Sequence, residues 1–425
     1  MFRHRIAASI SAYLFLVQGA QAQTASLNSG DTAWVLAATC LVLLMTIPGL
    51  ALFYGGLVRK KNVLATIMQS FAACCLVTVL WVIAGCSFAF SGQDLWLGDT
   101  KQLFLNALTK DALTGTIPET LFMVFQMSFA IITPAVICGA FADRMKFSSL
   151  LWFLGAWLML VYVPVAHWVW GGGFLQKMGF LDFAGGTVVE INSGVAGLVS
   201  ALMLGKRKGF PSEAMVPHNL ILSVTGASLL WVGWLGFNGG SALGANATAA
   251  FALANTQIAG AAAALMWMGI EWWLHQRPSV LGIISGAVAG LVAITPACAY
   301  VSPMGALLVG VAAGAGCFYA ATTMKRYFGY DDSLDVFGVH GIGGVVGILS
   351  IGLLGSKSWG GTAGLFEGNA AQLWIQIEGM LVVAVWCALL SFAILWVIER
   401  AIGLRVSKQT EIEGLDLNLH GEVVP

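Results

Sequence analysis

The sequence predicts an all-α polytopic membrane protein with eleven transmembrane helices, built as an inverted repeat of five plus five helices with a terminal helix. Three observations predict this fold. Of the 425 residues, 58% are hydrophobic and only 9% are charged, whereas soluble globular domains carry about 25% charged residues. The charges cluster between long uncharged runs, and three short strings recur in the same order in two halves of the chain. Lipid is therefore the expected solvent for most of the surface, and a soluble enzyme is excluded.

The first 22 residues are predicted to be a secretory signal peptide. Arg3 and Arg5 precede an apolar run over 6–17, and Ala20-Gln21-Ala22 provides an A-x-A cleavage site. We expect the mature chain to begin at Gln23, with its N-terminus outside the cell.

Uncharged runs of about 20 residues mark the predicted spans, because each is long enough to cross a hydrocarbon core of about 30 Å. Breaks near 239–247 and 300–303 divide two runs that are too long for one span. The predicted spans are 32–58, 63–90, 120–142, 147–170, 186–204, 217–240, 248–272, 279–300, 303–324, 336–356 and 371–398. The domains predicted are a signal peptide (1–22), a membrane domain (23–402; repeat halves 32–204 and 217–356, eleventh helix 371–402) and a cytoplasmic tail (403–425).

The basic residues support this topology. An odd number of spans puts the tail on the opposite side from the mature N-terminus. Fourteen Lys and Arg residues, among them Arg59, Arg144 and Arg207, then fall on the cytoplasmic side. Only four fall on the outer side, Lys101, Lys110, Lys177 and Lys357. This bias agrees with the positive-inside rule.

An internal repeat relates spans 1–5 to spans 6–10. Phe-Tyr-Gly-Gly at 53–56 corresponds to Phe-Asn-Gly-Gly at 237–240, and Ile-Thr-Pro-Ala occurs at 132–135 and again at 294–297. Glu190 and His340 are followed by small residues at the same offsets. Because five is odd, consecutive copies insert with opposite orientations, and such inverted repeats place a substrate path near the membrane midplane.

Glu190 and His340 are ionisable residues deep inside predicted spans, where a carboxylate costs about 2.5–3.5 kcal/mol to insert. We expect the two side chains to meet in the interior. One interpretation is a pair of packing groups that link the two halves; the other, which the symmetry favours, is a pore or transport path for a proton or a small hydrogen-bonding solute. Imidazole can donate and accept hydrogen bonds, and the pair can share one proton.

Several classes of function are excluded or disfavoured. Twenty basic and twenty acidic residues leave no net charge, so no basic field attracts nucleic acid. The eight cysteines lie in apolar stretches without a CxxC motif, which indicates packing rather than metal or redox chemistry. We expect no cofactor, no metal and no catalytic residue.

Four aromatic residues lie beside small residues: Phe125, Phe129, Trp170 and Phe237. Their rings either pack between helices or line a constriction, where contact with the ring faces would stabilise a cation.

The sequence resembles the ammonium transporter family, which also includes the Rhesus-type channels. The resemblance rests on motifs in family order over nearly the whole mature chain: Thr46–Leu57, Phe125-Gln-Met-Ser-Phe129, Ala166–Gly173, Asp182–Thr187, Gly236–Ser241 and Asp335–Gly341. It implies an ammonium or ammonia substrate and a homotrimer of eleven-span protomers in the lipid bilayer, each with its own pore.

The resemblance also implies roles for individual residues. Phe125, Trp170 and Ser241 would recruit ammonium on the outer side, and Phe129 and Phe237 would form a gate of stacked rings below that site. Asp182 would order the outer mouth without touching substrate. His340 would be the second of two pore histidines.

Glu190 departs from the family pattern, because most bacterial members have a histidine there. A carboxylate changes the field in the pore and offers a different proton carrier. The hypothesis is that substrate loses its proton near the gate, ammonia passes through the hydrophobic stretch, and Glu190 with His340 relays the proton.

The resemblance extends to the tail, which in relatives supports docking of a PII-type nitrogen-regulatory protein; the alternative is a merely solvated tail. The predicted function is ammonium transport in the bacterial inner membrane, with the C-terminus in the cytoplasm. Two alternatives remain, an ammonium sensor with low flux and a neutral ammonia channel of the Rhesus type.

Overall fold

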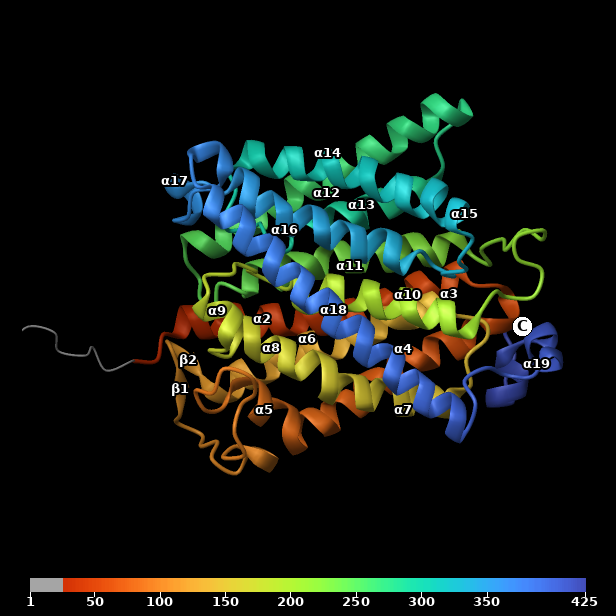
Figure 1. The fold of residues 1–425 in the computed structure, drawn as a ribbon, viewed down its shortest axis with the longest axis horizontal. Coiled ribbons are helices and arrows are strands. Elements are labelled where there is room, and N and C mark those ends of the chain that lie inside the picture. Colours follow the sequence, from red (N-terminus) through yellow and green to blue (C-terminus); the bar gives the residue numbers. More distant parts are fainter. Residues whose placement is uncertain (1–25) are drawn as a thin grey trace, which may run out of the picture.

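The computed structural model describes residues 26–425 as a bundle of long helices that run roughly side by side (Figure 1). The predicted signal peptide, 1–22, lies outside the described residues. Residues just after 25 lie at one end of the bundle and the C-terminus lies at the other (Figure 1), as an odd number of crossings requires. We call the end that carries the C-terminal residues the tail side.

Eleven helical segments of the described chain cross the bundle. Ten are long and apolar enough to span a membrane, and the eleventh is a shorter apolar helix. The first half comprises α2 (Ser29–Leu44) with α3 (Ala51–Leu57), α4 (Val63–Leu80) with α5 (Cys86–Phe90), α6 (Glu119–Ile137), α7 (Phe147–Trp157) with α8 (Val163–Trp170) and α9 (Phe174–Lys177), and α10 (Asn192–Leu204). The second half comprises α11 (Leu220–Gly240), α12 (Ala247–His275), α13 (Val280–Ile294), α14 (Pro303–Tyr319) with α15 (Lys325–Phe328), and α16 (Ile342–Leu354).

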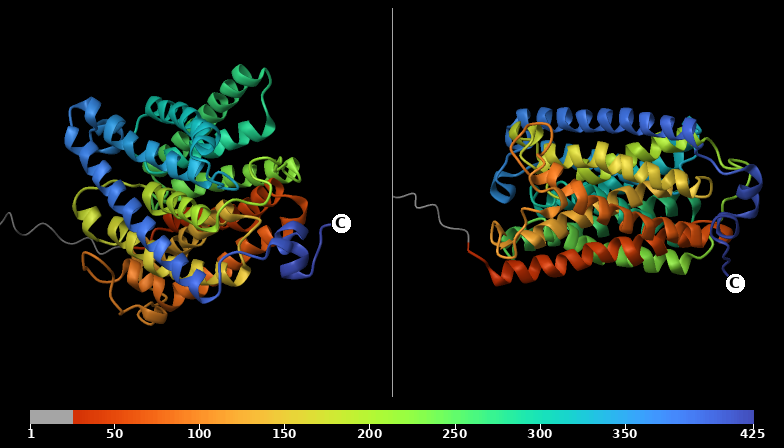
Figure 2. Two further views of the ribbon diagram at one scale, coloured as in Figure 1. Left: turned by 45° about the vertical axis from the view of Figure 1, so that its right-hand side comes forward. Right: turned by 90° about the horizontal axis from the view of Figure 1, so that it is seen from below.

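The terminal helix α18 (Ala370–Ala401) runs along the side of the bundle for its whole length (Figure 2). On the side opposite to the tail, short elements connect the spans: β1 (Leu113–Thr114), β2 (Ile117–Pro118) and α17 (Lys357–Gly360). All eleven predicted spans are thereby confirmed as helices, and the chain is a multi-pass membrane protein.

The eighth span is shorter than predicted. The sequence predicts 279–300, but α13 ends at Ile294, directly before Thr295 and Pro296. Proline has no N–H to donate and disfavours helical backbone in the residue before it. The non-helical segment that follows is held by the Asn255 side-chain amide, which donates to the carbonyls of Cys298 and Val301 at 2.8 and 2.9 Å. Thr295, Cys298 and Val301 are fully buried, so this non-helical backbone lies inside protein and not in lipid.

Each half contains a π-helical turn, preceded by an aspartate, at the corresponding place. A π-helical turn, Gly186–Ile191, carries Glu190, and a second one, Phe337–Gly341, carries His340. Eight residues before each of these side chains lies an aspartate that accepts backbone N–H groups at the start of the turn, Asp182 in one half and Asp332 in the other. The same spacing from aspartate to π turn in both halves agrees with the predicted repeat.

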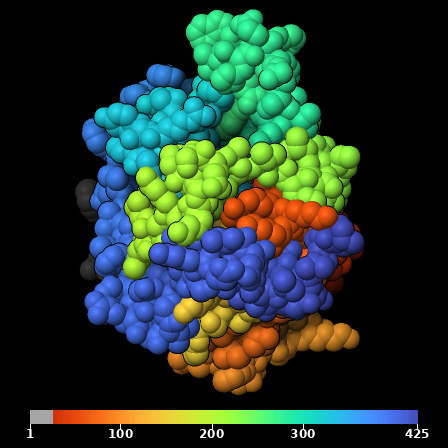
Figure 3. All heavy atoms as spheres, turned by 90° about the vertical axis from the view of Figure 1, so that its right-hand side faces the viewer, coloured from red at the N-terminus to blue at the C-terminus, as the bar shows by residue number. Residues whose placement is uncertain are grey.

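The tail is folded against the loops of the tail side and continues from α19 (Lys408–Glu413) into a turn, Asp416–His420. Arg405 Nη2 donates to the Glu411 carboxylate at 2.8 Å, and Glu411 is 1% exposed. The Asp416 carboxylate accepts the N–H groups of Leu64 and Ala65 at 3.1 and 2.8 Å. Figure 3 shows the C-terminal residues in blue across this face, beside the red-orange segment near residue 60.

Asp416→Ala is expected to loosen this tail. The change removes the acceptor for two N–H groups in the first turn of α4, and the loss of such a cap costs about 1 kcal/mol. Hydrogen exchange of the amides of Leu64, Ala65 and 407–420 should become about fivefold faster than in the unmodified protein. Glu422→Ala, at an exposed position of the same tail, is the matched control and should leave the exchange rates unchanged. Equal rates in the Asp416→Ala protein would contradict the capping role.

Candidate functional site

A small aromatic cavity opens on the side opposite to the tail. It has a volume of about 180 Å³, and its lining includes Phe129, Trp170, Phe183 and Ser241. The indole N–H of Trp170 donates to the Asp182 carbonyl at 2.8 Å, so the ring is held in one orientation. The Ser241 hydroxyl donates to the Phe237 carbonyl at 2.9 Å, which leaves its lone pairs free to accept a hydrogen bond. The cavity thus offers π faces and a hydroxyl acceptor, both suited to a small cation.

Phe125 does not line this cavity. Its ring is 1% exposed and packs at an angle of 64° against Phe129, with ring centroids 5.0 Å apart. Phe125 therefore contacts the ring that closes the cavity. The structure brings Trp170 and Ser241 together as the sequence predicts, and places Phe125 one layer behind them.

Two stacked rings separate the aromatic cavity from the interior. Phe129 and Phe237 lie with centroids 4.1 Å apart and planes inclined by 28°, and each is 1% exposed. Phe129 lines the aromatic cavity on one side, and Phe237 lines the next cavity on the other. The stack leaves no open passage, so a solute can pass only if the rings move.

Below the stack is a narrow cavity of about 10 Å³, which we call the central channel. Its walls are apolar apart from two side chains, Glu190 and His340, and include Val136, Val189, Leu230, Trp234 and Val288. Nδ1 of His340 lies 2.6 Å from Oε2 of Glu190. The two residues expected to meet in the interior therefore do so, and they form a short hydrogen bond inside the apolar channel. Which atom carries the proton depends on the tautomer of the imidazole.

The pair is brought together by close packing of the two repeat halves. A Cβ atom on Gly194 would lie 2.3 Å from the backbone of Gly341, and one on Gly344 would lie 3.1 Å from Cβ of Glu190. Only glycine allows α10 to approach the π turn Phe337–Gly341, and α16 to approach the π turn Gly186–Ile191, so closely. The small residues that follow Glu190 and His340 in the sequence thus have a direct structural purpose.

Asp182 organises the loop beside the aromatic cavity. Its carboxylate accepts the N–H groups of Gly185, Gly186 and Thr187 at 2.8, 2.6 and 2.7 Å, and the Thr187 hydroxyl at 2.6 Å. Gly185 has a φ of 122°, which favours glycine. Asp182 is 5% exposed and does not line the cavity, so it acts on the site through the backbone that it holds.

A wider cavity of about 650 Å³ lies on the tail side. Phe53 and His340 line both this cavity and the central channel. Its mouth carries charged groups, among them Lys325, which donates to Asp335 at 2.7 Å, and Arg207. Burial raises the pKa of Asp331, but the hydrogen bonds and charge of Arg207 outweigh burial and hold that pKa below its ordinary value. This loop therefore carries a buried ion pair at ordinary pH.

Three cavities thus follow one another along the bundle axis. The aromatic cavity reaches the Phe129–Phe237 stack, the central channel continues from Phe237 to His340, and the tail-side cavity continues from His340.

The sequence did not predict several lining residues, including Gln126 and Phe183 at the aromatic cavity. Gln126 lies inside the motif at 125–129, which was the only signal that could have found it. In the part of the chain that the structure describes, no group of three or more His, Cys, Asp or Glu residues is arranged to hold a metal ion.

An inverted repeat of membrane-spanning helices with cavities in line at its centre defines a membrane transport protein. Comparison with known proteins gives the family. The family model described as Ammonium Transporter Family matches residues 33–424. The ammonium transporter of Aquifex aeolicus is 49% identical over 406 residues, which cover 95% of both chains. This chain belongs to the ammonium transporter family.

Solved structures agree with this assignment. The crystal structure of Candida albicans Mep2 matches with a TM-score of 0.84 and 32% identity, over 90% of this chain and 88% of that chain. A structure described as a sensor Amt protein matches with a TM-score of 0.86 and 28% identity, over 92% of this chain and 98% of that chain. The relatives named as ammonium transporters are transport proteins and not enzymes.

Proposed function

We propose that this chain is an ammonium transporter of the bacterial inner membrane, with the aromatic cavity outside and the tail in the cytoplasm. The observation that carries the proposal is the line of three cavities with a single hydrogen-bonded pair, Glu190 and His340, in its apolar middle section. A bare ion would lose most of its hydration there without replacement. Ammonia, which is neutral and small, loses far less.

The proposed path begins at the aromatic cavity. Ammonium is recruited there by the Trp170 ring and the Ser241 hydroxyl, with Phe125 supporting the rings from behind. At the Phe129–Phe237 gate the substrate gives up a proton, and neutral ammonia enters the central channel. Asp182 holds the loop of the outer mouth in place. The substrate regains a proton in the tail-side cavity, where charged groups and water are available.

The released proton is carried by the Glu190–His340 pair. A carboxylate and an imidazole 2.6 Å apart share one proton readily, and either group can take up a second proton and pass one on. The carboxylate takes the place that the family resemblance gives to a histidine. The relay is therefore expected to work with one carboxylate and one imidazole.

The assembly proposed is a homotrimer in which each protomer has its own pore, with a PII-type regulatory protein as a partner at the cytoplasmic face. The folded tail supports the second part of this proposal. Its contacts with the first turn of α4, through Leu64, Ala65 and Asp416, give a partner on the tail a route to the second membrane span.

The test is the current evoked by an ammonium pulse in proteoliposomes of the purified protein, with empty liposomes as the control. A saturable current supports electrogenic transport. Absence of a current together with ammonia uptake would favour the neutral Rhesus-type channel. Absence of both, with retained ammonium binding, would favour the sensor.

Trp170→Leu is expected to raise the ammonium concentration for half-maximal current about tenfold. The change removes a ring whose contact with a desolvated cation is worth about 1–2 kcal/mol. The maximal current should fall much less, because the gate and the Glu190–His340 pair are untouched. Trp359→Leu is the matched control, since Trp359 is 53% exposed and lines no part of the aromatic cavity. Equal half-saturation in both variants would contradict recruitment at Trp170.

A further inference from the structure

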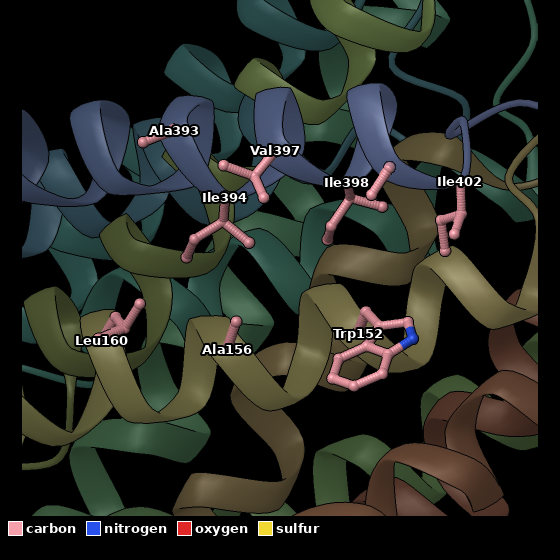
Figure 4. A pocket seen from close by; sticks show the side chains of 9 residues that line it. Trp152, Ala156, Leu160, Ala393, Ile394, Val397, Ile398 and Ile402 are labelled. Atoms are coloured by element: carbon pink, nitrogen blue, oxygen red, sulfur yellow. The ribbon is translucent and has the colours of Figure 1, made fainter.

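An apolar groove lies on the outside of the bundle between α7 and α18 (Figure 4). Its volume is about 560 Å³. Every residue that lines it is apolar: Trp152, Ala156, Leu160, Ala393, Ile394, Val397, Ile398, Ala401 and Ile402. Trp152 is 69% exposed and Val397 is 56% exposed, so the groove is open to the surroundings of the helices. In a multi-pass membrane protein those surroundings are lipid.

The groove has the depth of one membrane leaflet. Along α18 and its C-cap, the lining runs from Ala393 to Ile402, which are nine residue steps apart. At 1.5 Å of rise per residue this is about 14 Å, which is close to half of a hydrocarbon core of about 30 Å. The lining ends at the last turn of α18 on the tail side. The groove therefore extends from the tail-side interface to about the midplane, as an acyl chain does.

A positive group, Lys146, lies at its tail-side end. The Ile402 carbonyl accepts from Nζ of Lys146 at 2.6 Å. Lys146 directly precedes α7, so the free N–H groups of the first turn of that helix lie here too. The nearby Glu399 carboxylate accepts the Leu404 N–H at 2.6 Å.

We propose that this groove is a binding site for an anionic phospholipid of the tail-side leaflet. One acyl chain lies between α7 and α18, and the phosphate lies beside Lys146 and the N-terminus of α7. The combination of an apolar groove one leaflet deep with positive charge at its interfacial end selects a lipid over a peptide or a free anion. A retained lipid fastens the terminal helix to the fourth span next to the residue that leads into the tail.

The test is native mass spectrometry of the delipidated full-length protein titrated with phosphatidylglycerol or with phosphatidylcholine of the same acyl chains. The unmodified protein should retain one tight lipid per chain and bind the anionic lipid about fivefold more tightly. Ala156→Trp fills the middle of the groove and should weaken this site about tenfold for both lipids, as the loss of about two CH₂ contacts would. Trp152→Ala removes one exposed wall and should act in the same direction.

Lys146→Gln separates the contribution of charge from that of the groove. Glutamine can still donate to the Ile402 carbonyl, so the variant should keep the lipid site but lose most of the fivefold preference. Val385→Trp is the matched control, because Val385 lies on α18, is 56% exposed and does not line the groove.

Three results would each overturn the proposal. The first is unchanged lipid affinity in both Ala156→Trp and Trp152→Ala. The second is an unchanged preference for the anionic lipid in Lys146→Gln. The third is a change in the number of chains per complex caused by Ala156→Trp with lipid binding intact, which would show that a second copy of the chain covers the groove.

Discussion

Replacing Glu190 with Gln is expected to reduce the ammonium current about a hundredfold. Glutamine can hydrogen-bond to His340 across the 2.6 Å distance, but it cannot take up and release a proton. The loss of a positioned proton carrier costs about a factor of 10²–10⁴ in comparable reactions. The quantity to measure is the initial current in proteoliposomes at several pH values, because the pH dependence should flatten as the current falls.

Glu190→His is the control for this change. A histidine restores a titratable hydrogen-bonding partner for His340, so this variant should keep most of the current with an altered pH profile. If Glu190→Gln carried the same current with the same pH profile as the unmodified protein, the relay role of Glu190 would be ruled out.

Asp182→Asn is expected to destabilise the protein by at least about 3 kcal/mol and to abolish transport. An amide has one acceptor oxygen in place of two, and its NH₂ group would face N–H groups that the carboxylate now satisfies. Hydrogen bonds to a charged group contribute about 1.5–3 kcal/mol each, and buried N–H groups without a partner add a further cost. The measurement is the thermal unfolding midpoint of the purified protein together with its current.

Asp111→Asn is the matched control for Asp182→Asn, because Asp111 is exposed on a loop of the same side of the bundle. It should leave both the midpoint and the current unchanged. An Asp182→Asn protein with an unchanged midpoint would contradict the organising role of this carboxylate.

The positions and directions of the membrane spans were predictable because they depend on the hydrophobicity and charge of long segments and not on individual contacts. Runs of apolar residues and the distribution of Lys and Arg report span positions directly, and the structure has a helix at every predicted position. The end of α13 was not predictable in this way. Its early stop at Ile294 is a local effect of Pro296, and the non-helical backbone that follows is held by Asn255, a residue of another helix whose amide donates to two of its carbonyls.

The candidate site was only partly predictable. The equivalent positions of Glu190 and His340 in the repeat were enough to predict that they meet, because symmetry relates two places that are 150 residues apart. The two π turns that orient them leave no signature in residue pattern. The position of Phe125 behind Phe129 depends on ring packing and backbone direction, which a list of aromatic residues does not contain.

The capping of α4 by Asp416 has a consequence for biosynthesis. The two partners are 351 residues apart in the sequence, so most of the chain must leave the ribosome before the first turn of α4 acquires its acceptor. Membrane insertion of the early spans therefore precedes completion of the tail-side face. A chain that stops short of Asp416 would carry every membrane span and still lack the contact that joins its last segment to one of its first.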